Sequence, residues 1–260
     1  MWRHSIARFF DGRKGAVLVI GASSGIGREV ANELAACQQP IVLASRDIQE
    51  LKSIAVDLKI RYSVSCVVCM LDLAEIDAHT RQIADCIQSA FPLGLAGVVL
   101  CSGFSGDQKS AEVVWSESKQ ILDVNFVGCV SILNQLAGYF ESRGGGFIAV
   151  ITSVAGDRGR QSNYIYGAAK AGMATYVEGL RNRLHSANVS VTTIKPGYVD
   201  TPMTFGKPGV FMVASPRQVA RAIVGSIARR RHTAYVPGFW RWIMLVVRGV
   251  PESIFKRLHL

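Results

Sequence analysis

The stretch Ala16-Val17-Leu18-Val19-Ile20-Gly21-Ala22-Ser23-Ser24-Gly25-Ile26-Gly27, residues 16–27, decides the fold of this 260-residue chain. A short apolar run rich in β-branched residues is followed at once by three glycines and then by a helical pattern, which predicts strand, turn and helix. Such a unit aims backbone N–H groups and the positive end of a helix at a phosphate. We therefore predict a nucleotide pyrophosphate at Gly21, Ser23, Ser24, Gly25, Ile26 and Gly27, the alternative being a plain packing turn.

Six further apolar stretches predict strands, and helical patterns alternate with them along the chain. The expected strands lie near residues 40–44, 64–70, 95–101, 146–151, 189–195 and 232–236. This alternation predicts an α/β protein, a single Rossmann-type doubly wound parallel sheet of about seven strands with helices on both faces. With 49% hydrophobic residues and no interdomain linker, residues 1–260 are expected to form one domain.

Tyr166, Lys170 and Ser153 carry the strongest chemical signal. Residues four apart share one face of a helix, so the Lys170 ammonium is expected to lie beside the Tyr166 phenol. A nearby positive charge stabilises a phenolate and should lower the tyrosine pKa from about 10. We predict that Tyr166 gives a proton to a substrate oxygen that the Ser153 hydroxyl also holds, although a Tyr-x-x-x-Lys by itself also occurs by chance.

The glycine loop, Asn125, Ser153, Tyr166 with Lys170, and Pro196-Gly197 with Thr201 occur in the order and at the spacings of the short-chain dehydrogenase/reductase family. The sequence resembles this family over roughly residues 15–236. The resemblance implies an NADP-binding reductase domain in which Asn125 supports a water-mediated proton relay behind the lysine. It also implies cofactor contacts from Asp72, Leu73, Gly103, Tyr166, Lys170, Pro196, Gly197, Val199 and Thr201.

Two positions depart from the usual family pattern. Ile20 stands where threonine is common before the first glycine. Leu100-Cys101-Ser102-Gly103 replaces the usual Asn-Asn-Ala-Gly, so only Gly103 keeps that role.

Cofactor preference follows from Ser45, Arg46 and Asp47 after the second strand. An NAD site places a carboxylate about 20 residues past the glycine loop, where it would repel a 2′-phosphate. By resemblance that place is Ser45, which is uncharged, and Arg46 next to it can pair with a phosphate. We predict NADP(H) in preference to NAD(H), with Asp47 capping the next helix. The alternatives are a solvated charge at Arg46 and an ordinary turn at Asp72, where the family contacts adenine.

Six cysteines, at positions 37, 66, 69, 86, 101 and 129, lie in or beside apolar stretches. Cys66 and Cys69 have redox-motif spacing, but residues three apart on a strand point to opposite faces. We predict buried thiols of a reducing, cytoplasmic compartment rather than disulfides or a metal site.

The two ends of the chain carry its positive charge and many of its aromatic residues. Residues 203–260 hold ten Lys/Arg against one acid, and residues 1–15 hold four against one, so the middle is nearly neutral. The N-terminal segment 1–14 forms a basic amphipathic stripe, and the C-terminal segment 239–260 is basic and aromatic. The uncharged run 242–247 is far below the roughly 20 residues that cross a bilayer.

Cations with aromatic rings suit a lipid headgroup layer, so we expect peripheral association with the inner face of the cell membrane. A subunit interface or a docked tail is the alternative. Nucleic-acid binding is disfavoured because no base-reading motif accompanies Arg229-Arg230-Arg231. The stripe of the N-terminal segment is formed by Trp2, Ile6, Phe9 and Phe10.

Residues 153–170 and the closing 241–258 further resemble decaprenylphosphoryl-2-keto-ribose (erythro-pentose) reductases. That resemblance implies a ketone on a lipid-linked sugar, and the wider family resemblance favours a homodimer or homotetramer. Reduction of another apolar carbonyl, such as a sterol or acyl chain, is the alternative within the oxidoreductases, and a non-catalytic NADPH-binding regulator lies outside them. Residues 202–215 are expected to form a mobile apolar lid over the substrate, or else a static surface loop.

Overall fold

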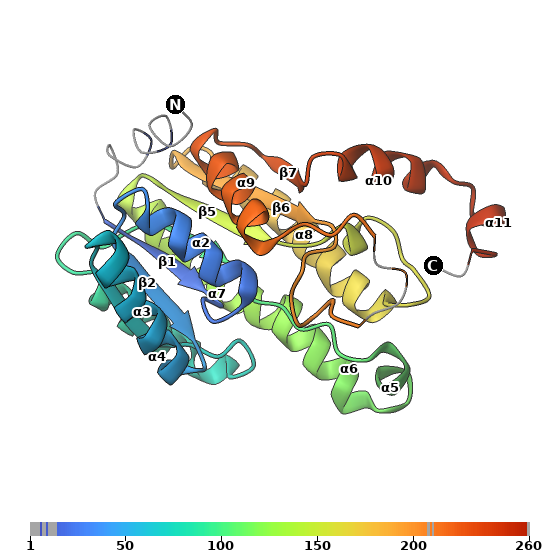
Figure 1. Cartoon of the computed structure of the whole chain (residues 1–260), viewed down its shortest axis with the longest axis horizontal. Helices are drawn as coiled ribbons and strands as arrows, with labels where there is room; N and C mark the ends of the chain where they lie inside the picture. Colours follow the sequence, from blue (N-terminus) through green and yellow to red (C-terminus); the bar gives the residue numbers. More distant parts are fainter. Residues whose placement is uncertain (1–5, 7–8, 10–14, 207–208, 210, 259–260) are drawn as a thin grey trace.

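The computed structural model describes residues 6, 9, 15–206, 209 and 211–258. Seven parallel strands form one sheet in the order β3-β2-β1-β4-β5-β6-β7 (Figure 1). The predicted fold class is confirmed, and each predicted strand lies within two residues of the observed bounds. The strands are β1 Ala16–Ile20, β2 Ile41–Ser45, β3 Cys66–Met70, β4 Leu95–Leu100, β5 Gly146–Ile151, β6 Val189–Pro196 and β7 Thr233–Val236.

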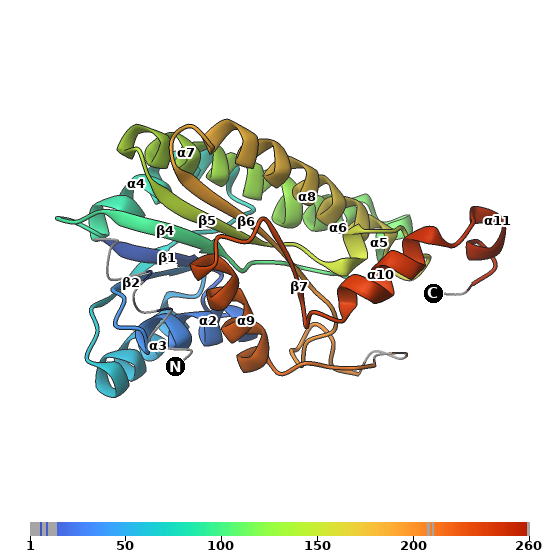
Figure 2. The ribbon, with the colours of Figure 1, turned by 90° about the horizontal axis from the view of Figure 1, so that it is seen from above.

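Helices cover both faces of the sheet (Figures 1 and 2). One apolar core contains residues of α2 Gly25–Ala35, α3 Ile48–Tyr62 and α9 Pro216–Ala228. The opposite core contains residues of α4 His79–Ser89, α7 Gly128–Arg143 and α8 Tyr164–Leu184. Beyond the sheet lie α5 Gln108–Val113, α6 Trp115–Leu122, a π-helical turn Asp123–Val127, α10 Trp240–Gly249 and α11 Glu252–Phe255.

The central strands read as unbroken apolar runs because both of their faces are covered. Every residue of β1, β2, β4 and β5 is buried, whereas the edge strand β3 exposes Val67 and Met70. A fully buried leucine such as Leu18 contributes roughly 1.5–3 kcal/mol relative to an exposed one. The core therefore fixes the directions of the strands and the edge at which they end.

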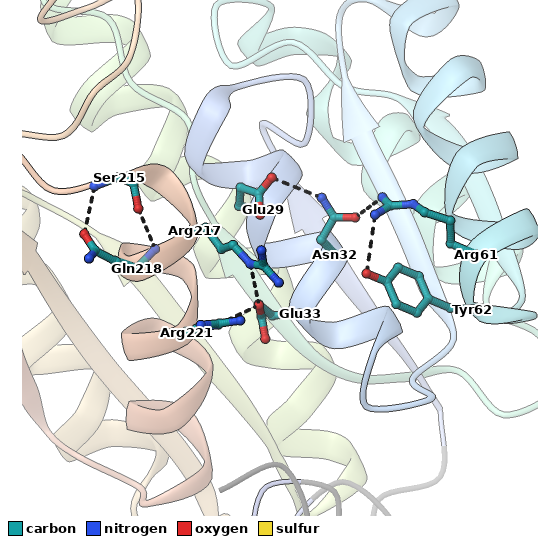
Figure 3. Close-up of polar contacts among 9 residues, drawn as sticks. All are labelled: Glu29, Asn32, Glu33, Arg61, Tyr62, Ser215, Arg217, Gln218 and Arg221. Atoms are coloured by element: carbon teal, nitrogen blue, oxygen red, sulfur yellow. Dashed lines mark hydrogen bonds and ion pairs between the residues drawn. The ribbon is translucent and has the colours of Figure 1, made fainter.

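Polar contacts tie α2 to the helices on either side of it (Figure 3). The buried Glu33 carboxylate accepts a hydrogen bond from Arg221 Nε at 3.0 Å, and Arg217 Nε lies 3.8 Å from the same oxygen. On the other side, Arg61 of α3 donates to Asn32 Oδ1 at 2.5 Å. These contacts stabilise the helix whose first turn carries the glycine loop.

The helical stretch Trp115–Arg143 is long and apolar enough to cross a membrane by length and composition, with a mean hydropathy of 1.4. In the fold, however, Ile132, Leu133 and Leu136 are fully buried in the core beneath the sheet. The stretch therefore serves as a core helix.

The described part of the N-terminal segment packs on the protein. Ile6 is 2% exposed and belongs to the same core as α2, and the Phe9 ring lies 6.3 Å from the Phe147 ring. Trp2 and Phe10 of the predicted stripe lie outside the described residues. At Ile6 and Phe9 the N-terminal segment therefore docks on the protein, which was one alternative to membrane association. All six cysteines are buried free thiols, as expected.

Candidate active site

The glycine loop joins β1 to α2 at the carboxyl edge of the sheet. The sheet order reverses beside β1, where Ile20 pairs with Leu100 of β4, and open α/β sheets bind ligands at such a point. Gly21 has a φ of +78°, and a Cβ on Gly27 would lie 2.2 Å from Gly21 O, so this tight turn requires glycine at both positions. Ser24 caps α2, with its Oγ accepting from Gly27 N at 3.0 Å.

The segment after β6 crosses the beginning of α2. A Cβ on Gly25 would lie 3.3 Å from Thr201 Cγ2, which places the predicted nicotinamide residue beside the glycine loop. Thr201 Oγ1 donates to Val199 O at 3.3 Å, and Thr201 N donates to Thr204 Oγ1 at 3.2 Å. Side chain and backbone of Thr201 are thus held in place by neighbours two and three residues away.

Ser153 follows the carboxyl end of β5, and Tyr166 and Lys170 lie near the start of α8, so the fold brings the three side chains together. Lys170 is 2% exposed, donates from Nζ to Ile151 O at 3.3 Å, and lies 5.6 Å from the Tyr166 ring centroid. Ser153 hydrogen-bonds the Tyr166 phenol, and its Oγ accepts from Ala155 N at 3.1 Å. The sequence spacing therefore does place a hydroxyl, a phenol and an ammonium in one cluster.

The expected lowering of the Tyr166 pKa by Lys170 is wrong for the protein on its own. Burial raises the pKa of Tyr166 to about 12, and the hydrogen bond with Ser153 only partly opposes this rise. Burial likewise lowers the pKa of Lys170, whose ammonium lies beside the ring and donates to a backbone carbonyl. Tyr166 thus keeps its proton at neutral pH, as a proton donor must.

Asn125 lies in the π-helical turn between α6 and α7 and is fully buried. Its Nδ2 donates to Ile121 O at 2.8 Å and to Phe104 O at 2.5 Å, while its Oδ1 accepts from Phe104 N at 3.2 Å. A Cβ on Gly103 would lie 3.3 Å from Asn125 Oδ1 and 3.4 Å from Lys170 Nζ. Asn125 therefore holds the loop after β4 against the lysine, and its water relay stays a prediction.

The residues predicted to contact the ribose and 2′-phosphate of NADP(H) lie where β2 meets α3. Asp47 caps α3, with its side chain accepting from Glu50 N at 3.0 Å, which confirms the predicted cap. Ser45 Oγ accepts from Asp47 N at 3.1 Å, and Arg46 is exposed. Sequence reasoning missed Arg28, which forms an ion pair with Glu50 and so brings a second guanidinium to the first turn of α3.

Asp72 forms the ordinary turn that was its alternative interpretation. Its Oδ1 accepts from Ala74 N at 3.0 Å, and His79 Nε2 lies 2.9 Å from its carbonyl oxygen. Leu73 is buried, and a Cβ on Gly128 would lie 2.0 Å from Leu73 O, so this loop packs against the start of α7. A contact with adenine stays a prediction.

Sequence reasoning also missed that α10 docks over the end of β6. A Cβ on Gly197 would lie 1.9 Å from Trp240 Nε1, and Gly197 N donates to Val236 O at 3.0 Å. The Trp240 ring lies 5.7 Å from Tyr198 and 5.4 Å from Phe211, both measured between ring centroids. The Pro196-Gly197 turn is therefore covered by an aromatic wall that reaches the expected lid.

The described residues fit a dinucleotide. Glycine at position 25 leaves space beside Thr201, and glycine at position 103 leaves space beside Lys170. A Cβ at either position would fill that space. Between them, the first turn of α2 presents its positive end. The glycine loop with the first turn of α2, the guanidinium of Arg46, and Tyr166 beside the buried Lys170 define a nucleotide-dependent oxidoreductase acting on CH–OH and C=O groups.

The short chain dehydrogenase family profile matches residues 15–207. The chain thus belongs to the short-chain dehydrogenase/reductase family. An uncharacterized oxidoreductase of Mycobacterium tuberculosis (strain ATCC 25618 / H37Rv) is 31% identical over 242 residues, covering 93% of this chain and 96% of the relative.

Solved structures share the fold at lower identity. A short-chain dehydrogenase from Sphingobium yanoikuyae in complex with NADPH aligns with a TM-score of 0.76 at 21% identity, covering 92% of this chain and 97% of the other. L-sorbose reductase from Gluconobacter frateurii, complexed with NADPH and L-sorbose, aligns with a TM-score of 0.76 at 22% identity, covering 87% and 96%.

Proposed function

We propose that this protein is an NADPH-dependent ketoreductase whose substrate is a lipid-linked sugar, such as a polyprenylphosphoryl 2-ketopentose. One observation carries the reaction: the half-buried Tyr166 phenol, whose pKa is raised to about 12, is hydrogen-bonded to Ser153 and lies adjacent to Lys170. When bound, the nicotinamide supplies the hydride that reduces the carbonyl carbon. The remaining chemistry is proton transfer and charge stabilisation by side chains of this chain.

Each side chain has a distinct part in that chemistry. Ser153 donates its O–H to the substrate carbonyl oxygen and stabilises the negative charge that develops there. Tyr166 transfers its phenolic proton to this oxygen, which completes the alcohol. The Lys170 ammonium then stabilises the phenolate that remains, and Asn125 keeps the neighbouring loop in place.

The preference for NADPH is supported at the start of α3. Ser45 offers no carboxylate, and the Asp47 carboxylate is occupied by the helix cap. The guanidinium of Arg46 is exposed for a 2′-phosphate, whereas the nearby Arg28 is paired with Glu50. NADPH in the related structures from Sphingobium and Gluconobacter agrees with this choice.

The substrate class is supported by the surroundings of the site rather than by the catalytic residues. The related reductase bound to L-sorbose acts on a keto-sugar, and the C-terminal sequence resembles enzymes of lipid-linked ketopentoses. One observation favours the second candidate, an apolar ketone such as a sterol or acyl chain. It is the aromatic wall of Tyr198, Phe211 and Trp240 beside the Pro196-Gly197 turn.

NADPH oxidation by the full chain tests the proposal against three groups of ketones. These are a polyprenylphosphoryl 2-ketopentose, the free ketopentose, and a panel of steroid and acyl ketones. We expect the lipid-linked sugar to have the highest kcat/KM. A higher kcat/KM for a steroid or acyl ketone would establish the second candidate, and NADPH binding without oxidation by any ketone would make the protein a regulator.

A further inference from the structure

The outer face of α10 is apolar and has no partner among the described residues. Trp240 and Met244 point inward and are each 2% exposed, packing in a small core with Val154. On the other side, Trp242 is 65% exposed, Leu245 63% and Val246 69%. A surface helix normally presents polar residues to water, so this face is built to contact something other than water.

Arg158, from the turn between Ser153 and Tyr166, fixes the position of this face. Its Nη1 donates to the carbonyl oxygens of Val247 at 2.8 Å and Val250 at 2.5 Å, near the last turn of α10. Its guanidinium stacks 3.8 Å above the Phe255 ring of α11. The C-terminal segment is therefore docked in one orientation and tied to the loop that carries Ser153.

The charges around the apolar face are almost all positive. Arg241, Arg248, Lys256 and Arg257 are exposed on α10, α11 and the turn that follows. The one acid of residues 203–260, Glu252, is neutralised by its ion pair with Arg158 at 2.9 Å. The surface thus combines exposed apolar side chains with uncompensated cations.

This combination favours an anionic lipid surface over a second copy of the chain. A two-fold contact would bring each copy's Arg241 and Arg248 against the same cations of the other copy, which costs energy. At a lipid surface, the same cations meet phosphate groups while the indole and aliphatic side chains enter the headgroup boundary. Charge complementarity therefore selects the bilayer.

The position of the face supports the same occupant. The helix α10 follows the carboxyl end of β7 after three residues, and it lies at the same end of the molecule as α5 and α6 (Figures 1 and 2). Other large apolar side chains at this end are strongly exposed, including Val113, Trp115 and Phe205. The active-site end of the molecule therefore carries exposed apolar side chains besides those of α10.

We infer that the outer face of α10, with the cations of residues 241–257, docks this protein on an anionic bilayer with the active-site edge toward the lipid. The inference goes beyond the proposed reaction, because docking does not depend on which ketone is reduced. It gives a ketone dissolved in, or attached to, the membrane a short path to Ser153 and Tyr166.

Cosedimentation of the full chain with vesicles tests the docking directly. We expect binding to vesicles of phosphatidylcholine mixed with phosphatidylglycerol, and little binding to phosphatidylcholine alone. Exchanging Arg241 and Arg248 for glutamine should weaken binding to the anionic vesicles by about 30-fold, since each such cation contributes a factor of about five. The triple variant Trp242→Ser, Leu245→Ser, Val246→Ser should weaken it at least as much.

Matched variants on α3 are the controls, because that helix carries exposed apolar and basic side chains on another face. Ile60 is 76% exposed and Val56 56%, so Val56→Ser with Ile60→Ser should leave vesicle binding unchanged. Lys52→Gln with Lys59→Gln controls for the loss of two charges. Equal loss in the α3 and α10 variants would show nonspecific attraction and overturn the inference.

Two further readouts separate this inference from the proposed reaction. Tyr166→Phe should bind vesicles like the natural protein, and the triple serine variant should oxidise NADPH normally with a soluble ketone. Light scattering tests the alternative that a second copy of the chain covers this face. If the natural protein is an oligomer that does not bind vesicles, and the triple variant is a monomer, the face is a subunit contact and the inference fails.

Discussion

Lys170 is held in the protein at a cost to stability, so replacing it with methionine should make the protein more stable while removing its activity. Its ammonium can donate three hydrogen bonds, is 2% exposed, and makes one hydrogen bond, to Ile151 O at 3.3 Å. Among the described residues no carboxylate forms an ion pair with it. Burial therefore lowers the pKa of Lys170 without a compensating negative charge.

The size of the effect follows from these contacts. Replacing buried ionic groups with apolar side chains of similar volume is often neutral or stabilises a protein by about 1–4 kcal/mol. Removing the donor to Ile151 O offsets about 1 kcal/mol of that gain. We expect Lys170→Met to raise the free energy of unfolding by up to about 3 kcal/mol at neutral pH, which raises the Tm of a chain of this length by up to about 12 °C.

The stability difference between the natural protein and Lys170→Met should also depend on pH. The pKa of Lys170 is lower in the folded protein than its ordinary value of 10.5. Between these two pKa values, the unfolded chain holds a proton that the native protein has released. In that pH range the contribution of Lys170 to the free energy of unfolding therefore becomes less unfavourable as the pH rises, and the advantage of Lys170→Met should shrink. Calorimetry without nucleotide at several pH values measures both effects.

The exposed lysine Lys52 on α3 provides a matched control. Lys52→Met should change the unfolding free energy by no more than about 0.5 kcal/mol at any of these pH values. A Lys170→Met protein that melts below the natural protein at neutral pH, or a gap that widens as the pH rises, would refute the reasoning about burial.

Four other variants give independent checks. Arg46→Ala should weaken NADPH binding by about 10- to 100-fold and leave NADH binding nearly unchanged in fluorescence titrations; equal losses for both nucleotides would exclude a 2′-phosphate contact. Gly27→Ala should lower the unfolding free energy by about 1–3 kcal/mol in urea, because its Cβ would meet Gly21 O at 2.2 Å. Gly179→Ala, which has open space in α8, should stabilise by about 1 kcal/mol. Arg158→Lys keeps the charge but loses the fork and the ring stacking, so limited proteolysis of the C-terminal segment should accelerate about tenfold or more; unchanged cleavage would mean that the segment docks without Arg158.

The sheet could be predicted from the sequence because its central strands are buried on both faces. Such strands must be continuous apolar runs, as Ala16–Ile20 and Gly146–Ile151 are, and turns or helices must separate them. The cap at Asp47 was equally accessible, since a helix start is set by residues a few positions apart. These features depend on local pattern alone.

The contacts of the C-terminal segment could not be predicted in the same way. Trp240 covers Gly197 from 43 positions away, and Arg158 reaches carbonyl oxygens about 90 positions further along the chain. The aromatic and basic composition signalled that this segment is unusual, but composition does not specify a docking partner. The pKa of Tyr166 was missed for a related reason, because its direction depends on how deeply the fold buries both the phenol and the ammonium.

Turnover of Tyr166→Phe at saturating NADPH tests the central claim most directly. The variant removes one hydroxyl and keeps the ring beside Lys170, so NADPH should still bind with nearly unchanged affinity. The account predicts that ketone reduction falls by at least about 100-fold, the contribution of a positioned proton donor. Turnover close to that of the natural protein, with NADPH bound, would contradict the assignment of Tyr166 as the acid.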